Sequence, residues 1–324
     1  MSGFQIVRVL NRGEIISGVI NGNEKDGIMH IVDVVLISII GIIEGVTEWL
    51  PISSTGHMMI FEHFFAGAFT EDFFTGDFKN MFEYLIQLGA ILAVVVVFWK
   101  RLFPFTLEKR EKIGENGQTL TRNVVAGKSE VWQTWLKVLV ACIPAVVAVV
   151  ADKLFDNLGE TGKIIVVGAM LALYGVAFIV VERLHKNKEP KTNTVGEITL
   201  KQAFFIGCFQ VLAAVPGTSR SGVTIIGALI LGLSRTAAAE FTFFLAIPTM
   251  IGASGYKILK FILGGGAITV PQISAIALGM VIAFVVSLFV IRFLTGFVKK
   301  HDFEPFGWYR IVLGILVIVL CLAF

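Results

Sequence analysis

The sequence predicts an all-α integral membrane protein with six transmembrane helices and two re-entrant half-helix pairs, arranged as inverted-topology repeats. The first observation is composition: of 324 residues, 56% are hydrophobic and 16% charged, and the mean hydropathy is +0.82. Soluble domains are about 45–50% apolar and about 25% charged. The second is that apolar runs recur at about 20 residues, the length that crosses a bilayer. The third is that two apolar regions are interrupted by Pro, Gly and hydroxyl residues, which break a helix.

Uninterrupted apolar runs predict six full spans, at about 81–100, 132–151, 162–182, 240–262, 272–295 and 306–324. The interrupted regions are 31–66 and 201–234, and we expect each to enter the membrane and turn back. Non-helical backbone at membrane depth is tolerated only where protein or a water-filled cavity surrounds it. Residues 1–28 contain no apolar core of a signal peptide. They predict a polar N-terminal extension before a single membrane domain, 29–324.

The distribution of lysine and arginine predicts the orientation. These residues gather in three connections, at 100–128, 183–201 and 292–300. Such connections are expected in the cytoplasm. The connections between them, at 62–80, 152–163 and 264–272, are acidic or nearly uncharged and are expected outside. With six spans, this alternation places both termini outside.

Short similar stretches predict an internal repeat, with repeat one at about 29–183 and repeat two at about 201–324. The stretches 41–44 and 51–56 of the first half correspond to 207–210 and 216–222 of the second. Three full spans follow each interrupted region, and an odd number inverts the second copy. Inverted repeats with broken helices place their binding site near the midplane, where the breaks meet.

The break in the second half predicts an anion site. Arg220 supplies a planar, permanently charged fork that suits phosphate oxygens. Glycines allow close approach of the backbone, hydroxyls donate hydrogen bonds, and the following half-helix presents free N–H groups. The alternative is a polar helix break whose arginine pairs with a buried glutamate. The expected binding residues are Gly217, Thr218, Ser219, Arg220, Ser221, Gly222 and Thr224.

The break in the first half brings carboxylates, hydroxyls and a histidine close together in sequence. Glu44 and Glu48 share one helical face, where two carboxylates repel or recruit a cation. Oxygen ligands beside a phosphate site suggest Mg²⁺ or Ca²⁺. An ion pair with Arg220 is the alternative, and the two are compatible.

The hydroxyls Ser53, Ser54 and Thr55 and the imidazole of His57 follow in the same break. A serine needs a base to attack phosphorus, and His57 can supply it. His57 could instead protonate the leaving phosphate or be the nucleophile itself. A histidine that only makes structural hydrogen bonds is the other alternative.

The stretches Glu44–His57 and Pro216–Thr224 resemble the undecaprenyl pyrophosphate phosphatase family of bacterial membranes, also called bacitracin-resistance proteins. The family pattern reads E-G-x-T-E, then P-x-S-S-T-G-H, then P-G-x-S-R-S-G-x-T. All three motifs occur here in that order and without substitution. The similarity extends from about Met29 to the C-terminus, so it includes nearly all of the expected membrane domain.

The resemblance implies an enzyme that hydrolyses undecaprenyl diphosphate to undecaprenyl phosphate and inorganic phosphate. This reaction recycles the lipid carrier of cell-wall synthesis, and it protects against bacitracin through the shared lipid. The resemblance also implies a divalent cation, Mg²⁺ or Ca²⁺, and an active site on the outer face of the bacterial inner membrane. The implied functional positions are Glu44, Glu48, Ser54, His57 and Arg220, with Ser53, Ser219, Ser221 and Thr224 lining the pocket. The motif leaves open whether Ser54 or His57 is the nucleophile.

The same residues are also compatible with other functions. A transporter or flippase of a polyprenyl phosphate lipid is the main alternative, because inverted repeats with broken helices are a transporter architecture. Type 2 phosphatidic acid phosphatases have a further histidine that is missing here after Arg220, and an intramembrane serine protease is a third alternative. The net charge of +3 gives no reason to expect nucleic acid. A homodimer is left open.

Overall fold

A computed structural model describes residues 29–69, 74, 76–113, 119–147 and 158–323. The predicted N-terminal extension, 1–28, lies outside the described residues, as does the end of the predicted span 132–151. The helices are α3 (Ile31–Thr47), α4 (Ser54–Phe65), α5 (Gly76–Val97), α6 (Trp99–Leu102), α7 (Ser129–Cys142), α9 (Glu160–His185), α10 (Leu200–Val211), α11 (Arg220–Ile230), α12 (Arg235–Leu263), α13 (Val270–Phe297) and α14 (Glu304–Ala323). Short 3₁₀ turns lie at Ala66–Ala68, Val195–Glu197 and Leu212–Ala214.

The prediction of six membrane-spanning helices is confirmed by length and composition. In the described part of the chain, six helices are long and apolar enough to cross a bilayer: Phe78–Val97, Ser129–Val147, Glu160–His185, Arg235–Leu263, Val270–Phe297 and Glu304–Ala323. Each contains most of a predicted run. The interrupted regions form shorter helices, with α3 and α4 in the first and α10 and α11 in the second. The fold is therefore an all-helical membrane bundle, with one exception outside the bundle.

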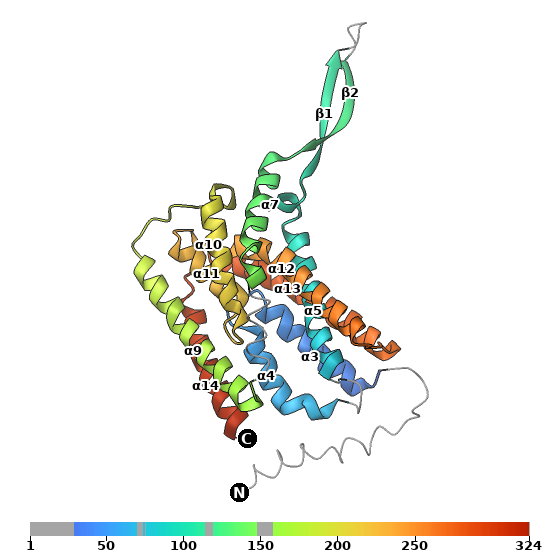
Figure 1. Ribbon diagram of the computed structural model, residues 1–324. Coiled ribbons are helices and arrows are strands. Elements are labelled where there is room, and N and C mark those ends of the chain that lie inside the picture. The colour runs from blue at the N-terminus through green and yellow to red at the C-terminus, as the bar shows by residue number, and fades with distance from the viewer. Residues whose placement is uncertain (1–28, 70–73, 75, 114–118, 148–157, 324) are drawn as a thin grey trace.

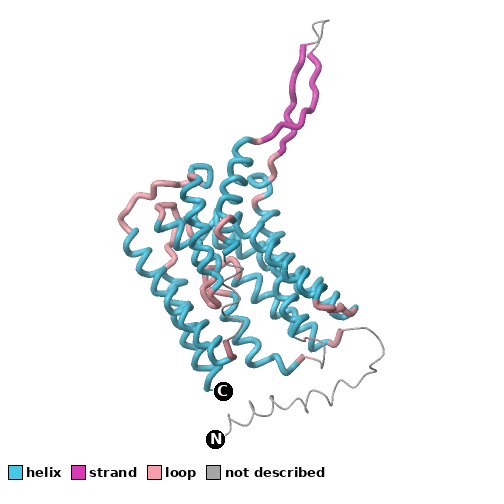
Figure 2. The backbone as a smooth tube through the Cα atoms, in the orientation of Figure 1, coloured by secondary structure: helices cyan, strands magenta, loops and turns pink. Residues whose placement is uncertain are grey.

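The exception is a β-hairpin in the connection between the first two spans. The sequence predicted a basic connection there and no strands. Strands β1 (Phe105–Ile113) and β2 (Thr119–Gly127) pair antiparallel, with Phe105 opposite Gly127. Figures 1 and 2 show the hairpin projecting beyond the helices, at the end opposite the C-terminus. Its lysines and arginines explain why composition suggested only a cytoplasmic connection.

Helices of the first half of the chain pack against helices of the second half. Helices α9 and α14 lie side by side (Figure 1), and α5 packs on α12. Helix α13 contacts α3 and α5, and α7 in turn contacts α10 and α12. Helix α4 packs on α14, whereas α11 packs on α9. This packing buries the two breaks among the helices, while α3 and α10 keep an exposed apolar side.

The core lies around the first half of α12. The side chains of Phe241, Phe243 and Phe244 are almost completely buried there. Trp49, from the first break, is 1% exposed and meets Phe243 edge to face, with ring centroids 5.4 Å apart. The break is therefore anchored in the core by an aromatic side chain, which restricts how the polar residues around it can move.

The three basic connections come together at one end of the bundle. Lys299 borders one surface pocket with Lys100 and Arg101, and a second pocket with Lys186 and Lys191. Lysines and arginines from the three basic connections therefore lie near one another in the structure.

Close contact between α5 and α13 depends on Gly89. A Cβ atom there would collide with the backbone carbonyl of Met280. We expect Gly89→Ala to destabilise the protein by about 1–3 kcal/mol, because overpacking forces backbone shifts. Gly252→Ala is the matched control, since a Cβ at Gly252 meets nothing within 4 Å. Thermal unfolding in detergent measures both, and equal melting temperatures for the two variants would contradict the prediction.

Candidate active site

Both helix breaks contain a serine with unusual backbone geometry. Ser53 has a φ of 74° and Ser219 a φ of 67°, and they are the only non-glycine residues with positive φ in the described chain. Ser53 directly precedes α4, and Ser219 directly precedes α11. Left-handed conformations in non-glycine residues cost of order 1–3 kcal/mol and cluster at functional sites. The strain therefore marks the same position in both breaks.

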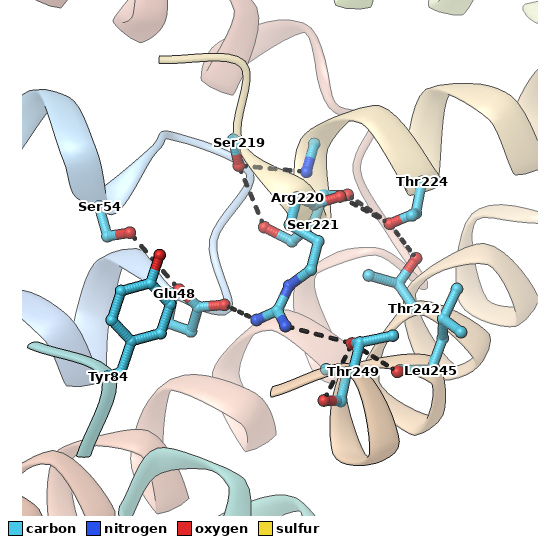
Figure 3. Close-up of polar contacts among 12 residues, drawn as sticks. Glu48, Ser54, Tyr84, Ser219, Arg220, Ser221, Thr224, Thr242, Leu245 and Thr249 are labelled. Carbon is cyan, nitrogen blue, oxygen red and sulfur yellow. Dashed lines mark hydrogen bonds and ion pairs between the residues drawn. The ribbon is translucent and has the colours of Figure 1, made fainter. Parts of the chain in front are cut away.

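The two breaks meet through Glu48 and Arg220. The guanidinium Nη2 of Arg220 donates to Glu48 Oε1, and Ser54 Oγ donates to Glu48 Oε2 at 3.4 Å. Figure 3 shows Ser54, Glu48 and Arg220 in one line across the breaks. Ser221 adds a weaker link, with Oγ 3.5 Å from the carbonyl oxygen of Leu50. The structure thus brings together three of the residues that the sequence singled out, and it contains the ion pair that was the alternative for Arg220.

The other end of the Arg220 guanidinium is held by α12. Its Nη1 donates to Thr249 Oγ1 at 3.3 Å (Figure 3). Thr249 follows Pro248, and its own hydroxyl donates to the carbonyl of Leu245 at 2.9 Å. Arg220 is therefore held between Glu48 and Thr249, which orients its fork.

The hydroxyls around Arg220 divide into two groups. Ser219 Oγ caps α11 by accepting from the N–H of Gly222 at 3.2 Å, and it lies 3.3 Å from Ser221 Oγ. Thr224 points the other way: its Oγ1 donates to the Arg220 carbonyl at 2.9 Å and accepts from Thr242 at 3.0 Å. Ser219 and Ser221 thus lie together at the start of α11, whereas the Thr224 hydroxyl is used in helix packing.

Among the described residues, His57 makes its hydrogen bonds to groups other than Ser54. Its Nδ1 lies 2.8 Å from the carbonyl oxygen of Ser53, and its Nε2 lies 2.7 Å from the hydroxyl of Tyr309. Among the described residues, Ser54 Oγ has its hydrogen bond to Glu48. The hypothesis that His57 directly accepts the proton of Ser54 therefore finds no contact in this conformation.

Several buried polar atoms at the breaks are not used by the protein. In the described chain, the buried side-chain atoms without a hydrogen-bond partner are Glu44 Oε1, Trp49 Nε1, Ser53 Oγ, Thr218 Oγ1 and Arg310 Nε. The first four lie in or beside a break, and the fifth belongs to a residue that contacts both breaks. Buried polar groups in native proteins are normally paired. Their concentration here indicates a place that binds a polar ligand.

The remaining predicted residues have different surroundings. Thr55 is exposed in the first turn of α4. Gly217 has a φ of 87° and lies against the backbone of Val167 in α9, so a side chain there would collide. Gly222 lies within contact distance of Arg310, where an added Cβ would be 3.2 Å from Nη1. These glycines keep the second break close to its neighbours.

Arg310 was not among the residues predicted from the sequence, although it contacts both breaks. It lies in α14 and is completely buried. Its Nη1 donates to the carbonyl of Pro51 at 3.2 Å, and its Nη2 donates to the carbonyls of Gly217 and Thr218 at 3.0 and 2.9 Å. One guanidinium therefore connects the two breaks. A signal was present, because an arginine inside a predicted span is a functional candidate by default.

Three further neighbours were also missed. Thr249 could have been found from the proline before it, since Pro248 lies inside the predicted span 240–262, and a proline within a helix is a usual cause of a kink. Tyr84 points toward the contact between Ser54 and Glu48 in Figure 3. Tyr309 carries no comparable signal, because a tyrosine near the start of a transmembrane helix is ordinarily assigned to the membrane interface.

A family model describes most of the chain. The model named "Bacitracin resistance protein BacA" matches residues 37–316, which include both breaks and all the contacts above. The chain belongs to the BacA family. The resemblance expected from the motifs is therefore confirmed.

Relatives with BacA-family sequences match over nearly their whole length. The undecaprenyl-diphosphatase of Enterococcus faecalis is 47% identical over 293 residues, which are 90% of this chain and 98% of the relative. That of Desulfitobacterium hafniense is 46% identical over 293 residues, or 90% and 97% of the two chains. That of Streptococcus equi subsp. zooepidemicus is 49% identical over 280 residues, or 86% and 93%. The alignments leave no large part of the relatives without a counterpart here.

The BacA-family resemblance implies a divalent cation, and the carboxylates of the first break fit one. Glu44 is 2% exposed, and its Oε1 has no hydrogen-bond partner in the described chain. Glu48 lies one turn away, and Glu83 of α5 is near enough to act on Glu44 electrostatically. No group of three or more His, Cys, Asp or Glu side chains with metal-binding geometry occurs among the described residues. A site with one or two carboxylates, completed by substrate phosphates and water, is the usual arrangement for Mg²⁺.

Proposed function

We propose that this protein is an undecaprenyl-diphosphatase that hydrolyses undecaprenyl diphosphate to undecaprenyl phosphate and inorganic phosphate. The observation that carries the proposal is the contact of Ser54, Glu48 and Arg220 across two helix breaks, in a chain that the BacA family model matches over 37–316. A nucleophile, an acceptor for its proton and a phosphate-binding fork lie together. The substrate is a polyprenyl diphosphate lipid, and the long apolar tail is accommodated by the membrane around the helices.

The phosphate-binding groups, the nucleophile and the proton acceptor have separate roles in this proposal. Arg220 and the N–H groups at the start of α11 hold the diphosphate. A phosphate oxygen that binds Arg220 takes over the contact now made by Glu48 and frees the carboxylate. Ser54 Oγ attacks the terminal phosphorus, its proton passes to Glu48, and the bond to the bridging oxygen breaks as undecaprenyl phosphate leaves. Water then hydrolyses the phosphoserine to release phosphate. All the residues belong to one chain, so the proposal needs no second copy.

Phosphate release by the purified protein tests the function. We expect inorganic phosphate from undecaprenyl diphosphate, and a slower release from short-chain prenyl diphosphates. Ser54→Ala should remove the activity without unfolding the protein, since Ser54 is only partly buried. Binding of the lipid by wild type without any phosphate release would favour the transporter alternative.

Glu44 and Glu48 are proposed to hold the cation, Mg²⁺ or Ca²⁺. When bound, it neutralises charge on the phosphate oxygens and orients the phosphoryl group. We expect a chelator to abolish turnover and added Mg²⁺ or Ca²⁺ to restore it. Glu44→Gln should raise the metal concentration for half-maximal activity by at least about 10-fold, since even indirect partners of metal ligands have effects of this size.

The control for the metal prediction is Glu304→Gln. Glu304 forms an ion pair with the exposed Arg183, far from the breaks in sequence and at the start of α14. Its variant should keep the metal requirement of wild type. Full activity of wild type in excess chelator would refute the metal site.

We infer that the chain lies in the bacterial inner membrane with its active site open to the outer face. The grouping of basic connections around Lys299 supports this orientation, because such residues are retained in the cytoplasm. In a cysteine-free background, Gly76→Cys should react with a membrane-impermeant maleimide in whole cells, whereas Phe105→Cys should react only after lysis. Both positions are exposed. The reverse labelling pattern would invert the topology.

We further infer that the interrupted regions are re-entrant pairs and that the two halves are inverted repeats. At 1.5 Å per residue, α10 and α11 extend only ~18 and ~17 Å, well short of a bilayer core of about 30 Å. The matched packing of the halves supports the repeat, since α3 contacts α13 as α10 contacts α7. Gly41 approaches the backbone of Gly279 in α13, and Gly207 that of Ala141 in α7. The equivalent glycines thus make equivalent contacts with the opposite half.

A further inference from the structure

A hydrogen bond between distant parts of the chain holds the histidine of the first break. His57 Nε2 lies 2.7 Å from the hydroxyl of Tyr309, and the two rings stack with centroids 5.7 Å apart and planes 10° apart. His57 comes from α4 and Tyr309 from α14, 252 residues later. Tyr309 directly precedes Arg310, the residue whose guanidinium connects both breaks. Helix α14 therefore contacts the site through two successive side chains.

The partners of His57 determine which of its nitrogens carries the proton. A backbone carbonyl only accepts hydrogen bonds, so Nδ1, 2.8 Å from the Ser53 oxygen, must be the N–H. In the neutral ring, Nε2 is then the acceptor, and Tyr309 must donate its O–H to it. When the ring takes up a proton, the proton goes to Nε2, and Tyr309 must accept instead. Tyr309 can do both because a phenol is a donor and an acceptor.

This arrangement locates the exchangeable proton of His57 at Nε2, on the side of Tyr309. Ser54, by contrast, donates to Glu48 at 3.4 Å. The carbonyl that fixes Nδ1 belongs to Ser53, one of the two strained residues, so the orientation of the imidazole is tied to the geometry of the break. The Tyr309 side chain is 45% exposed, and within the described part of the chain its hydroxyl bonds to His57.

We propose that Tyr309 is a positioning residue for the phosphatase reaction: its hydroxyl fixes the ring orientation of His57 and serves Nε2 as a donor before that nitrogen gains the proton and as an acceptor afterwards. The proposal rests on the proposed function and adds to it that His57 gives or takes a proton during turnover, one of the roles that the sequence motif leaves open for it. Tyr309 acts through His57 and need not touch the substrate. The carbonyl of Ser53 sets the tautomer through Nδ1, and Tyr309 holds the other end of the ring at Nε2.

Tyr309→Phe isolates the hydroxyl, because phenylalanine keeps the stacked ring. We expect kcat for phosphate release to fall about 10- to 100-fold, the scale of a misplaced catalytic group, with KM within about twofold of wild type. Tyr256→Phe is the matched control, since Tyr256 is 47% exposed on α12 and makes no described contact with His57. It should behave as wild type. Wild-type kcat in Tyr309→Phe would overturn the proposal.

A double-mutant cycle separates positioning from general stability. In a His57→Ala background, measured at high enzyme concentration, Tyr309→Phe should cause no further loss, because the group through which it acts is gone. The same fold-loss in both backgrounds would show that Tyr309 acts independently of His57, and would overturn the proposal. Failure of wild type itself to release phosphate would instead reject the proposed function.

Nitrogen NMR of histidine-labelled protein gives a readout that does not depend on activity. The His57 signals, assigned by comparison with His57→Ala, should show a protonated Nδ1 and an unprotonated Nε2 that accepts a hydrogen bond. In Tyr309→Phe, the Nε2 signal should move to the position of a nitrogen without a donor. A protonated Nε2 in neutral wild-type His57 would contradict the assigned tautomer and the proposal with it.

Discussion

Replacing Arg220 with lysine is expected to lower kcat/KM for phosphate release by about 10²- to 10³-fold, or about 3–4 kcal/mol of transition-state stabilisation. Lysine keeps the charge but cannot reach Glu48 and Thr249 at once, as the two ends of the Arg220 fork do. It also cannot bind two phosphate oxygens side by side. Phosphate release is measured on folded, purified protein at several substrate concentrations, so that kcat and KM are separated.

Arg235→Lys is the matched control for Arg220→Lys. Arg235 also forms a close ion pair, with Glu182, but that pair lies at the start of α12 and away from the breaks. Its lysine variant should lose some stability and keep the activity per folded molecule. An equal loss of activity in both variants would indicate that Arg220→Lys acts through folding.

A double variant tests whether Arg220 serves only to pair with Glu48. Removing one member of a buried pair leaves an uncompensated charge, whereas neutral replacement of both is often tolerated. We expect Arg220→Gln combined with Glu48→Gln to fold but to remain inactive. Near wild-type turnover in the double variant would show that Arg220 and Glu48 serve only to pair with each other, and would remove both from the proposed mechanism.

Arg310→Met is expected to have the second large effect, on stability and activity together. Methionine fills much of the same space but leaves the carbonyls of Pro51, Gly217 and Thr218 without their donors. Each buried group that loses its partner costs about 1–3 kcal/mol. Relief from burying the guanidinium offsets part of this, so we expect a net destabilisation of about 2–4 kcal/mol. The breaks also lose their connection, and a displacement of about 1 Å can lower the rate about 100-fold.

Thermal unfolding and phosphate release, measured on the same preparations, check the Arg310 prediction. Arg183→Met is the control, because Arg183 is an exposed arginine of α9 whose ion pair with Glu304 lies on the surface. Surface pairs contribute about 0.2–1 kcal/mol, so its variant should stay close to wild type in both measurements. A stable and fully active Arg310→Met protein would show that other contacts hold the breaks together.

The membrane-spanning helices could be predicted because their cause is local. A run of apolar residues needs no particular partner to be driven into the bilayer, and backbone hydrogen bonds are satisfied within the helix itself. The breaks could be predicted for the same reason, because proline, glycine and hydroxyl residues interrupt a helix at their own position in the sequence. The hairpin at 105–127 was missed, because its charged strands lack the apolar alternation that usually identifies a strand.

The candidate residues of the site were likewise visible in the sequence, whereas their partners were not. Glu48 and Arg220 stood out as charges at membrane depth, but their contact joins residues 172 positions apart. His57 stood out as a base near Ser54 in sequence, yet its nitrogens face Ser53 and Tyr309. Residues three apart in a helix share a face, so the spacing permitted a contact. The hydrogen bonds nevertheless go to Glu48 and Tyr309, which belong to other parts of the chain.

Sequence by itself determined that this protein is a helical membrane protein, that its helices break at two polar stretches, and that those stretches carry phosphatase motifs. These properties depend on hydropathy, backbone preference and residue chemistry, which each residue or short segment carries with it. The tertiary structure alone decided that Arg310 connects the breaks, that Glu48 receives both Ser54 and Arg220, and that Tyr309 holds His57. Such contacts depend on how helices rotate and pack against one another, because a hydrogen bond requires the two heavy atoms to be close together and within a narrow range of angles.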